Sequence, residues 1–206
     1  MSQELIDLVA KGDFKAVKAI VGRGADVNYR GTHGNTPLGY STMGGTEITS
    51  FLLDAGANPN SPAYEDGSPV GLAAYEGNAP TVELLLAHGA DPNVPNPNTG
   101  VTPLHEAVVK STDAARICVA LLLKAGANPN ASTKHDVETN AFYESVRVYA
   151  ECPLHWAAAY GDEATIQLLI EHGADKSRKD GRGETPAQWA GRHQRPREIR
   201  LLLRND

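Results

Sequence analysis

The sequence predicts an all-α fold, a solenoid of stacked helix–turn–helix units with short turns projecting from one edge. Two recurring phrases predict it. A Gly-Ala-Asp or Gly-Ala-Asn triplet returns five times along the 206 residues, and a Thr-Pro or Ser-Pro phrase returns in register with it. Repetition of two phrases at one period is typical of units that bury their apolar faces only against their neighbours.

The second helix of each unit ends at the triplet. Its glycine falls at positions 24, 56, 89, 126 and 173, which gives intervals of 32, 33, 37 and 47 residues. The residues seven, four and three places before each glycine are apolar, with Thr49 as the exception. Spacing of i, i+3 and i+4 places them on one helix face, and glycine supplies the positive φ that ends a helix.

The first helix of each unit begins at the other phrase. The sequence reads "TPLG" at 36, "SPVG" at 68, "TPLH" at 102, "CPLH" at 152 and "TPAQ" at 185. Thr or Ser caps a helix, and Pro in the first turn loses no hydrogen bond because that N–H has no helical partner. Each unit therefore contains two antiparallel helices and an extended turn.

The phrases "TPLHEA" at 102–107 and "CPLHWAAAYGD" at 152–162, with the five triplets, resemble the ankyrin repeat family. The resemblance covers nearly the whole chain. It implies an α-solenoid of stacked ankyrin repeats with projecting β-turn fingers, in one domain over 1–206. Six units are expected, at about 1–30, 31–61, 62–94, 95–131, 132–176 and 177–206.

Histidines at two motif positions are implied by the resemblance to tie adjacent turns together. These are His105 and His155, whereas Gly39 and Gly71 stand at the same position in units two and three. We expect those two units to be the softer ones. Trp156 and Trp189 follow the motif position and are expected to pack between units.

The interval from 126 to 173 contains an insertion of about 14 residues. Its segment "ASTKHDVETNAFYESVRVYA", at 131–150, has no Gly or Pro and is rich in aromatic and β-branched residues. We expect it to be ordered, as a longer hairpin or a short helix. Inserted loops on repeat scaffolds often bind partners, but these rings could also fold back and cover unit five.

Charge is unevenly distributed within a net charge of −6. Residues 1–175 hold 10 Lys or Arg against 21 Asp or Glu, and 176–206 hold 9 against 4. Residues 31–109 have no Lys or Arg but eight acids, which disfavours nucleic acid. We expect a protein partner whose basic patch faces Glu65, Glu76 and neighbouring acids, with a merely solvated acidic face as the alternative.

Catalytic and targeting signals are absent from the sequence. It lacks the H-E-x-x-H, paired C-x-x-C, G-x-S-x-G and G-x-x-x-x-G-K-[ST] motifs, and His88 and His172 stand at expected helix ends. We expect no enzyme, no metal and no cofactor, with a minor enzyme that uses His33, His135 or His193 and nearby carboxylates as the alternative. No signal peptide or membrane span is recognised, and Cys118 and Cys152 are expected to be free thiols in a cytoplasmic protein.

The resemblance implies that a partner protein binds the concave face and the fingers of a monomeric chain. The alternative is a sensor that holds a small molecule or nucleotide in the groove, which would need clustered cations there. The candidate binding residues lie at the ends of the first helices, on the fingers and in the insertion: His33, Met43, Tyr64, Glu65, Tyr75, Glu76, Val109, Lys110, Phe142, Tyr143, Tyr149, Tyr160, Arg182, Arg192 and His193.

Overall fold

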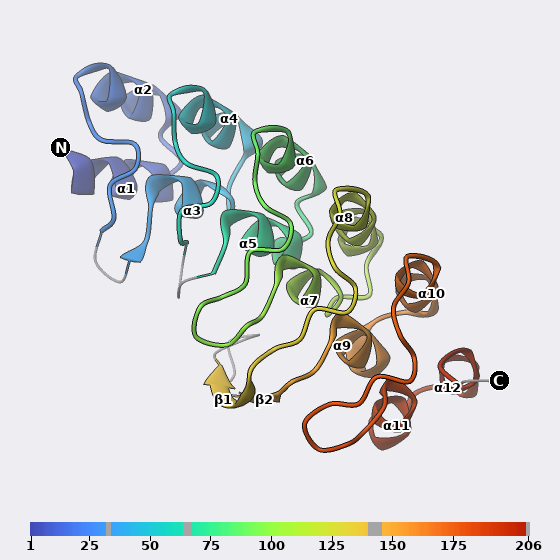
Figure 1. The fold of residues 1–206 in the computed structure, drawn as a ribbon. Coiled ribbons are helices and arrows are strands. Elements are labelled where there is room, and N and C mark those ends of the chain that lie inside the picture. Colours follow the sequence, from blue (N-terminus) through green and yellow to red (C-terminus); the bar gives the residue numbers. More distant parts are fainter. Residues whose placement is uncertain (32–33, 64–66, 140–145, 205–206) are drawn as a thin grey trace.

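The computed structural model is a curved stack of helix pairs (Figure 1). It describes residues 1–31, 34–63, 67–139 and 146–204. The predicted all-α solenoid is confirmed, with one small two-stranded sheet added. The helices are α1 (Ser2–Ala10), α2 (Phe14–Gly22), α3 (Pro37–Ser41), α4 (Thr46–Asp54), α5 (Pro69–Glu76), α6 (Ala79–Ala87), α7 (Pro103–Ala107), α8 (Asp113–Lys124), α9 (Pro153–Tyr160), α10 (Glu163–Glu171), α11 (Pro186–Arg192) and α12 (Arg197–Leu202).

The helices form two rows. The odd-numbered helices α1 to α11 contact one another in sequence order and make the inner row, and the even-numbered helices α2 to α12 make the outer row. Each inner helix also packs against the outer helix that follows it. The apolar core runs continuously between the rows, because each unit covers the face that its neighbour leaves open.

The predicted helix starts are confirmed by their caps. Thr36 accepts a hydrogen bond from the N–H of Gly39 (3.1 Å), and Ser68 accepts one from the N–H of Gly71 (3.0 Å). The helix ends are confirmed as well. Gly56 after α4 has a φ of 90°, and the other four triplet glycines have φ values between 85° and 91°.

Asparagine side chains join the loops of consecutive units. The side-chain amide of Asn28 donates to the carbonyl of Gly56 (3.0 Å), and its oxygen accepts from the N–H of Asn58 (2.7 Å). The same pair of bonds recurs at three later asparagines, each with the next triplet: Asn60, Asn93 and Asn130. This asparagine ladder fixes the spacing of the outer row along the described stack.

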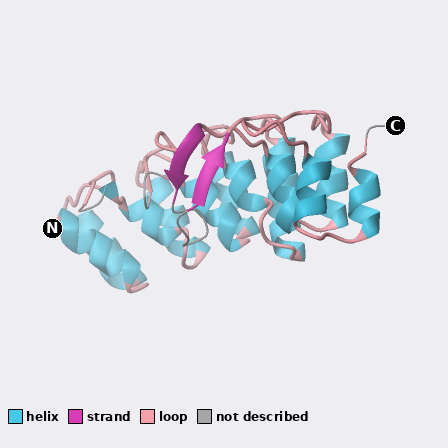
Figure 2. Cartoon of the chain, turned by 90° about the horizontal axis from the view of Figure 1, so that it is seen from below, coloured by secondary structure: helices cyan, strands magenta, loops and turns pink. Residues whose placement is uncertain are grey.

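The insertion forms a β-hairpin on the finger edge, as one of its two expected conformations. Strand β1 (His135–Thr139) pairs antiparallel with β2 (Val146–Tyr149), with a bulge between His135 and Val137. Figure 2 shows the strands at the edge where the loops between units lie. In Figure 1 they lie beside the inner row, next to α7 and α9. The hairpin therefore projects from the side of the stack that carries the inner helices.

Candidate partner-binding face

The palm is the surface formed where the inner helices end, and it collects most of the described candidate residues. Met43 and Tyr160 are 49% and 43% exposed, so two large apolar side chains face solvent at separate units. Val109 and Tyr75 are half-buried. The palm residues are Met43, Tyr75, Glu76, Val109, Lys110, Tyr160, Arg192 and His193.

In the central palm, the Lys110 ammonium contacts both a tyrosine ring and a carboxylate. The Lys110 ammonium lies 3.9 Å from the centroid of the Tyr75 ring and 3.6 Å from Oε2 of Glu76. These contacts link the end of α5 to the turn after α7. Because the side chains of Lys110 and Glu76 are both more than a third exposed, the pair adds little stability and mainly fixes the two groups in place.

The C-terminal palm is an aromatic cluster with one arginine. The Tyr160 ring meets His193 edge-on at 5.5 Å, and His193 stacks on Trp189 with its ring 20° from parallel. The Arg192 guanidinium lies 4.9 Å from the Trp189 ring and pairs with Glu184 at 2.8 Å. Burial lowers the pKa of His193, and the nearby arginine charges lower it further, which favours the neutral ring.

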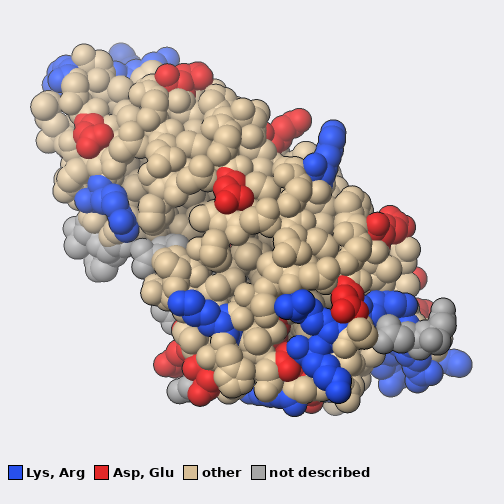
Figure 3. Space-filling view, in the orientation of Figure 1, with Lys and Arg blue, Asp and Glu red and all other residues tan. Residues whose placement is uncertain are grey.

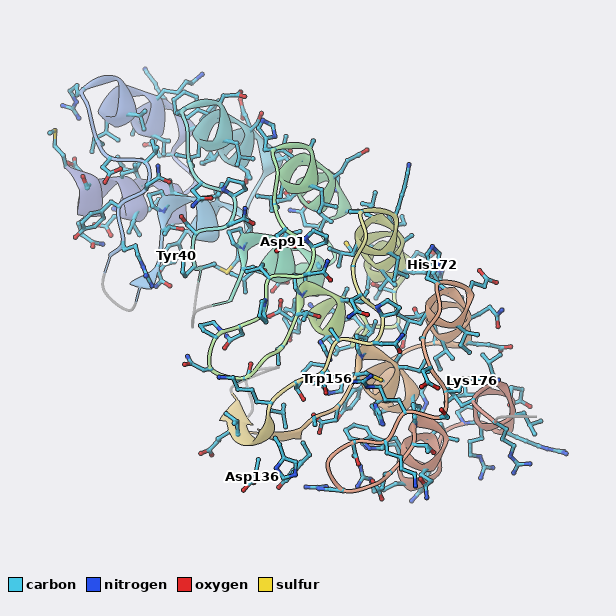
Figure 4. The ribbon with its side chains drawn as sticks, viewed as in Figure 1. Tyr40, Asp91, Asp136, Trp156, His172 and Lys176 are labelled. Atoms are coloured by element: carbon cyan, nitrogen blue, oxygen red, sulfur yellow. The ribbon has the colours of Figure 1, made fainter. Side chains whose placement is uncertain are left out.

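Trp156 and Trp189 pack between units as predicted, with only 4% and 8% of their surfaces exposed. Trp156 lies on α9 within the stack (Figure 4), where its ring meets His105 edge-on at 5.1 Å. The indole N–H of Trp189 donates to Asp180 (2.8 Å). Both indole rings are buried, and that of Trp189 contacts His193 and Arg192 of the palm.

The predicted histidine ties are confirmed. His105 accepts from the N–H of Thr102 (3.2 Å) through Nδ1 and donates through Nε2 to the carbonyl of Glu151 (3.2 Å). His155 makes the equivalent bond to the carbonyl of Glu184 (3.0 Å). Burial lowers the pKa of His105 to about 3, so this ring is neutral at physiological pH.

A second arginine–aromatic contact joins the hairpin to the last finger. The Arg182 guanidinium lies 3.7 Å from the ring of Tyr149, and the His135 ring meets that ring edge-on at 5.8 Å. Asp136, at the bulge, projects away from the helices (Figure 4). The sequence indicated Tyr149 and Arg182 separately, but their pairing depends on the hairpin lying against the finger at 181–183.

The base of the hairpin is packed. Thr133, Val148 and Glu151 are buried, and the N–H of Lys134 donates to the carbonyl of Thr99 (2.8 Å) in the preceding finger. The Glu151 carboxylate accepts from the hydroxyl of Thr133 and the N–H of Tyr149, both at 2.8 Å. The base of the insertion therefore covers unit five, and another part of the same insertion projects from it.

Five candidate residues lie outside the described residues: His33, Tyr64, Glu65, Phe142 and Tyr143. The acids of residues 31–109 are divided between surfaces. Glu76 and Glu106 lie on inner helices, whereas Glu47, Asp54 and Glu83 lie on outer helices. On the face drawn in Figure 3, Lys and Arg gather over the last units at the lower right, and the middle of the stack shows isolated acids.

Glu106 was missed by sequence reasoning. Its carboxylate occupies the position that a Cβ on Gly71 would take, so it fills part of the space left by the missing motif side chain. Burial raises the pKa of this carboxyl to about 8. Two features of the sequence could have indicated this contact. Gly71 has no side chain, and Glu106 directly follows His105, the motif histidine of the next unit.

The described ranges contain neither a cluster of metal-binding side chains nor a helix that could span a membrane. No three His, Cys, Asp or Glu side chains gather there as a metal site, and both cysteines are buried free thiols. None of the helices in these ranges is long and apolar enough to cross a membrane. At the palm, Lys110 pairs with Glu76, and Arg192 pairs with Glu184.

Comparison with known families decides the identity of the fold. A family model described as ankyrin repeats in three copies matches residues 5–96, 65–133 and 118–206. The chain belongs to the ankyrin repeat family. Ankyrin repeats are generally protein–protein interaction modules and are typically non-catalytic.

Relatives of this ankyrin chain are diverse. Human inversin is 29% identical over 90% of the chain, and ankyrin repeat and SOCS box protein 11 of Danio rerio is 35% identical over 61% of it. The chain spans only 16% of inversin and 36% of the Danio protein. Most of each of those proteins therefore has no counterpart in this chain.

Solved structures of similar extent share the ankyrin fold. An ankyrin repeat domain from Acinetobacter baumannii has a TM-score of 0.78 at 26% identity and matches 98% of this chain and 97% of its own. A chain in the complex of a predatory endopeptidase from Bdellovibrio bacteriovorus with an immunity protein has a TM-score of 0.75 at 23% identity, over 97% and 95%. At that identity the second likeness describes the fold alone.

Proposed function

We propose that this chain is a non-enzymatic binding module that holds a partner protein against its palm and fingers. The observation that carries the proposal is the row of accessible side chains at successive inner-helix ends, with Met43 and Tyr160 about half exposed. Tyr and Arg are favoured at interface hot spots, and both occur at the C-terminal palm. A single chain is the binding unit in this proposal.

The finer proposal concerns charge. A basic patch on the partner would face Glu76 and the acids near it, because residues 31–109 contain no Lys or Arg. Lys110 already pairs with Glu76. A competing partner cation would have to displace or share that contact, so its main effect would be on the rate and orientation of encounter.

The test is affinity capture from the source cells with palm variants, followed by mass spectrometry. We expect Tyr160→Ala and Met43→Ala to weaken capture of the same protein, because exposed side chains at an interface centre carry most binding energy. The matched control is Ile117→Ala on α8, since Ile117 is 52% exposed but lies on the outer row. Loss of capture with Ile117→Ala alone would place the interface elsewhere.

The hairpin is tested separately. Replacing residues 138–147 with Asn-Gly joins Val137 to Val148, which face each other across the strands, and keeps the buried Thr133, Val148 and Glu151. We expect the thermal midpoint to stay nearly constant and capture to fall. Full capture by the folded short-hairpin variant would remove the hairpin from the proposed site.

A further inference from the structure

An open groove of about 510 Å³ lies on the outer row, away from the palm. The rings of Phe14 and Phe51 meet edge-on at 5.7 Å in its floor. Both rings and Leu84 are only partly buried, so apolar surface stays accessible there. The outer groove is lined by Phe14 from α2, by Thr46, Glu47, Ser50, Phe51 and Asp54 from α4, and by Pro80 and Leu84 from α6.

The outer groove is acidic on its α4 side. Glu47 and Asp54 line it there, and both are exposed. Among the described residues, the Nε2 atom of His88 lies 3.6 Å from Oδ1 of Asp54. On the α2 side the Lys18 ammonium already lies 4.0 Å from the Phe14 ring. The groove therefore suits an apolar side chain that is flanked by cations on the α4 side.

The last helix presents a surface of that chemistry. Arg197, Arg200, Leu201 and Arg204 stand at i, i+3, i+4 and i+7, which places them on one face of α12 and its C-terminal turn. All four are exposed, with Leu201 at 48%. No guanidinium of this α12 face forms an ion pair with another residue that the structure describes. Ile199 and Leu203 are buried and hold the helix on the stack.

We infer that the α12 face of one copy docks in the outer groove of a second copy. Leu201 then covers Phe51 and Leu84, and its flanking arginines approach Glu47 and Asp54. This occupant matches the groove in both apolar character and charge, and the N-terminal and C-terminal parts of one chain carry the two complementary surfaces. Opposite potentials of this kind steer encounter and set orientation.

The geometry of this contact determines the assembly. The two surfaces differ, so each docked copy still presents an unused groove or an unused α12 face, and association continues as an open chain unless it closes into a ring. One helix face buries far less area than a stable dimer interface requires. Association is therefore weak, and we expect dilute protein to be monomeric, as the sequence predicts.

The palms stay free in such an assembly, because the outer groove is lined by α2, α4 and α6 of the outer row. Several palms held together bind a multivalent partner more tightly than one palm does, through a higher effective concentration. Self-association thus adds avidity to whatever the palm binds, but it does not depend on the palm having a partner.

The experiment is sedimentation velocity of the full chain from micromolar to millimolar concentration, at low and at high salt. We expect the mean mass to rise with concentration at low salt and to fall back when salt is added. Ser50→Arg, which fills the groove centre with a cation, and Leu201→Asp, which reverses the α12 face, should each lower the association constant by at least about tenfold.

A mixing experiment separates this contact from any other. Ser50→Arg keeps an intact α12 face and Leu201→Asp keeps an intact groove, so the two variants together should form a one-to-one dimer and nothing larger. Ile117→Asp is the control, because it changes an exposed apolar residue outside both surfaces. Glu47→Arg is a second groove variant at an exposed site, for use if Ser50→Arg alters the thermal midpoint.

Three results would overturn the inference. The first is a wild-type chain that stays monomeric at millimolar concentration and low salt. The second is self-association that neither groove nor face variants reduce, or that Ile117→Asp abolishes. The third is a variant mixture that remains monomeric although the wild type associates, since complementary intact surfaces would then have failed to bind.

Discussion

Units four and five differ from units two and three in how one repeat is joined to the next. His105 and His155 bridge two turns with ring nitrogens that both make hydrogen bonds. Gly39 and Gly71 provide no such bridge. There the backbone of Ala63 lies close against Gly39, and the Glu106 carboxylate enters the space beside Gly71.

The same repeat position can therefore join two units in either of two ways, by hydrogen bonds from a side chain or by close approach of a neighbouring backbone. A ring with two satisfied nitrogens makes directional contacts that are costly to lose once buried. A glycine instead lets a neighbouring backbone come near, and the contact depends on no side chain being there. Thr36 partly compensates in unit two, because its hydroxyl donates to the carbonyl of Pro62 (3.3 Å).

The largest effect should come from removing a histidine bridge. His105→Ala leaves a cavity and strips hydrogen bonds from the N–H of Thr102 and the carbonyl of Glu151, so we expect a loss of about 3 kcal/mol in unfolding free energy. Urea unfolding measures it. His172→Ala is the control, since this exposed ring caps a helix end and its loss should cost less than about 1 kcal/mol. Equal losses of unfolding free energy in the two variants would mean that the histidine bridge adds no more stability than an exposed helix cap.

Close approach at Gly39 predicts the next largest effect. A Cβ there would lie 2.8 Å from Cβ and 2.9 Å from Cα of Ala63, and backbone cannot move aside as a flexible side chain can. We expect Gly39→Ala to destabilise the chain by about 2 kcal/mol, despite a better helix propensity. Gly191→Ala on α11 is the matched control, because its Cβ would meet nothing within 4 Å. That change should stabilise by about 0.5 kcal/mol.

Native-state hydrogen exchange compares the two regions directly. We expect amides in α3 to α6 to exchange about tenfold faster than those in α7 to α10, because units without the histidine bridge open locally at lower cost. Mass spectrometry of peptic fragments provides the readout. Faster exchange in the histidine-bridged units would refute the idea that the bridges stiffen the C-terminal half.

The smallest effect concerns the acid that occupies the space at Gly71. The folded-state pKa of Glu106 is raised from 4.5 to about 8, so the folded chain holds this proton more tightly than the unfolded chain. The stabilisation is complete below the unfolded value and is lost as pH rises through 8. Because part of Glu106 still contacts solvent, we expect only about 1 kcal/mol. Glu106→Gln should flatten unfolding free energy between pH 5 and 8, and an unchanged slope would exclude this carboxyl as its source.

The repeating part of the fold was predictable because it depends on local rules. Caps, helix-ending glycines and apolar spacing act within a few residues, so Thr36 and Gly56 indicate helix boundaries by themselves. The motif histidines were assigned through family resemblance and are confirmed. The caps and the helix-ending glycines recur in most copies, which let one copy support the interpretation of another.

The remaining features depend on contacts between units, which a repeat pattern does not specify. The direction of the Glu106 side chain follows from the empty space at Gly71 in another unit. Lys110 pairs with Glu76 only because α5 and α7 are neighbours. The acidic residues of 31–109 looked like one face in sequence, but the two helix rows divide them. Binding at the candidate palm residues stays a prediction.

The asparagine ladder also has a consequence for engineering. Its bonds join residues 30 or 31 positions apart in the early units, 35 apart at Asn93 and Asn128, and 45 apart at Asn130 and Asp175, with the same atoms and nearly the same lengths. The spacing of the units therefore does not depend on the number of residues between two bonded positions of the ladder. We therefore expect a foreign sequence inserted into the hairpin to be displayed at a fixed position. The repeats on either side should keep their stacking.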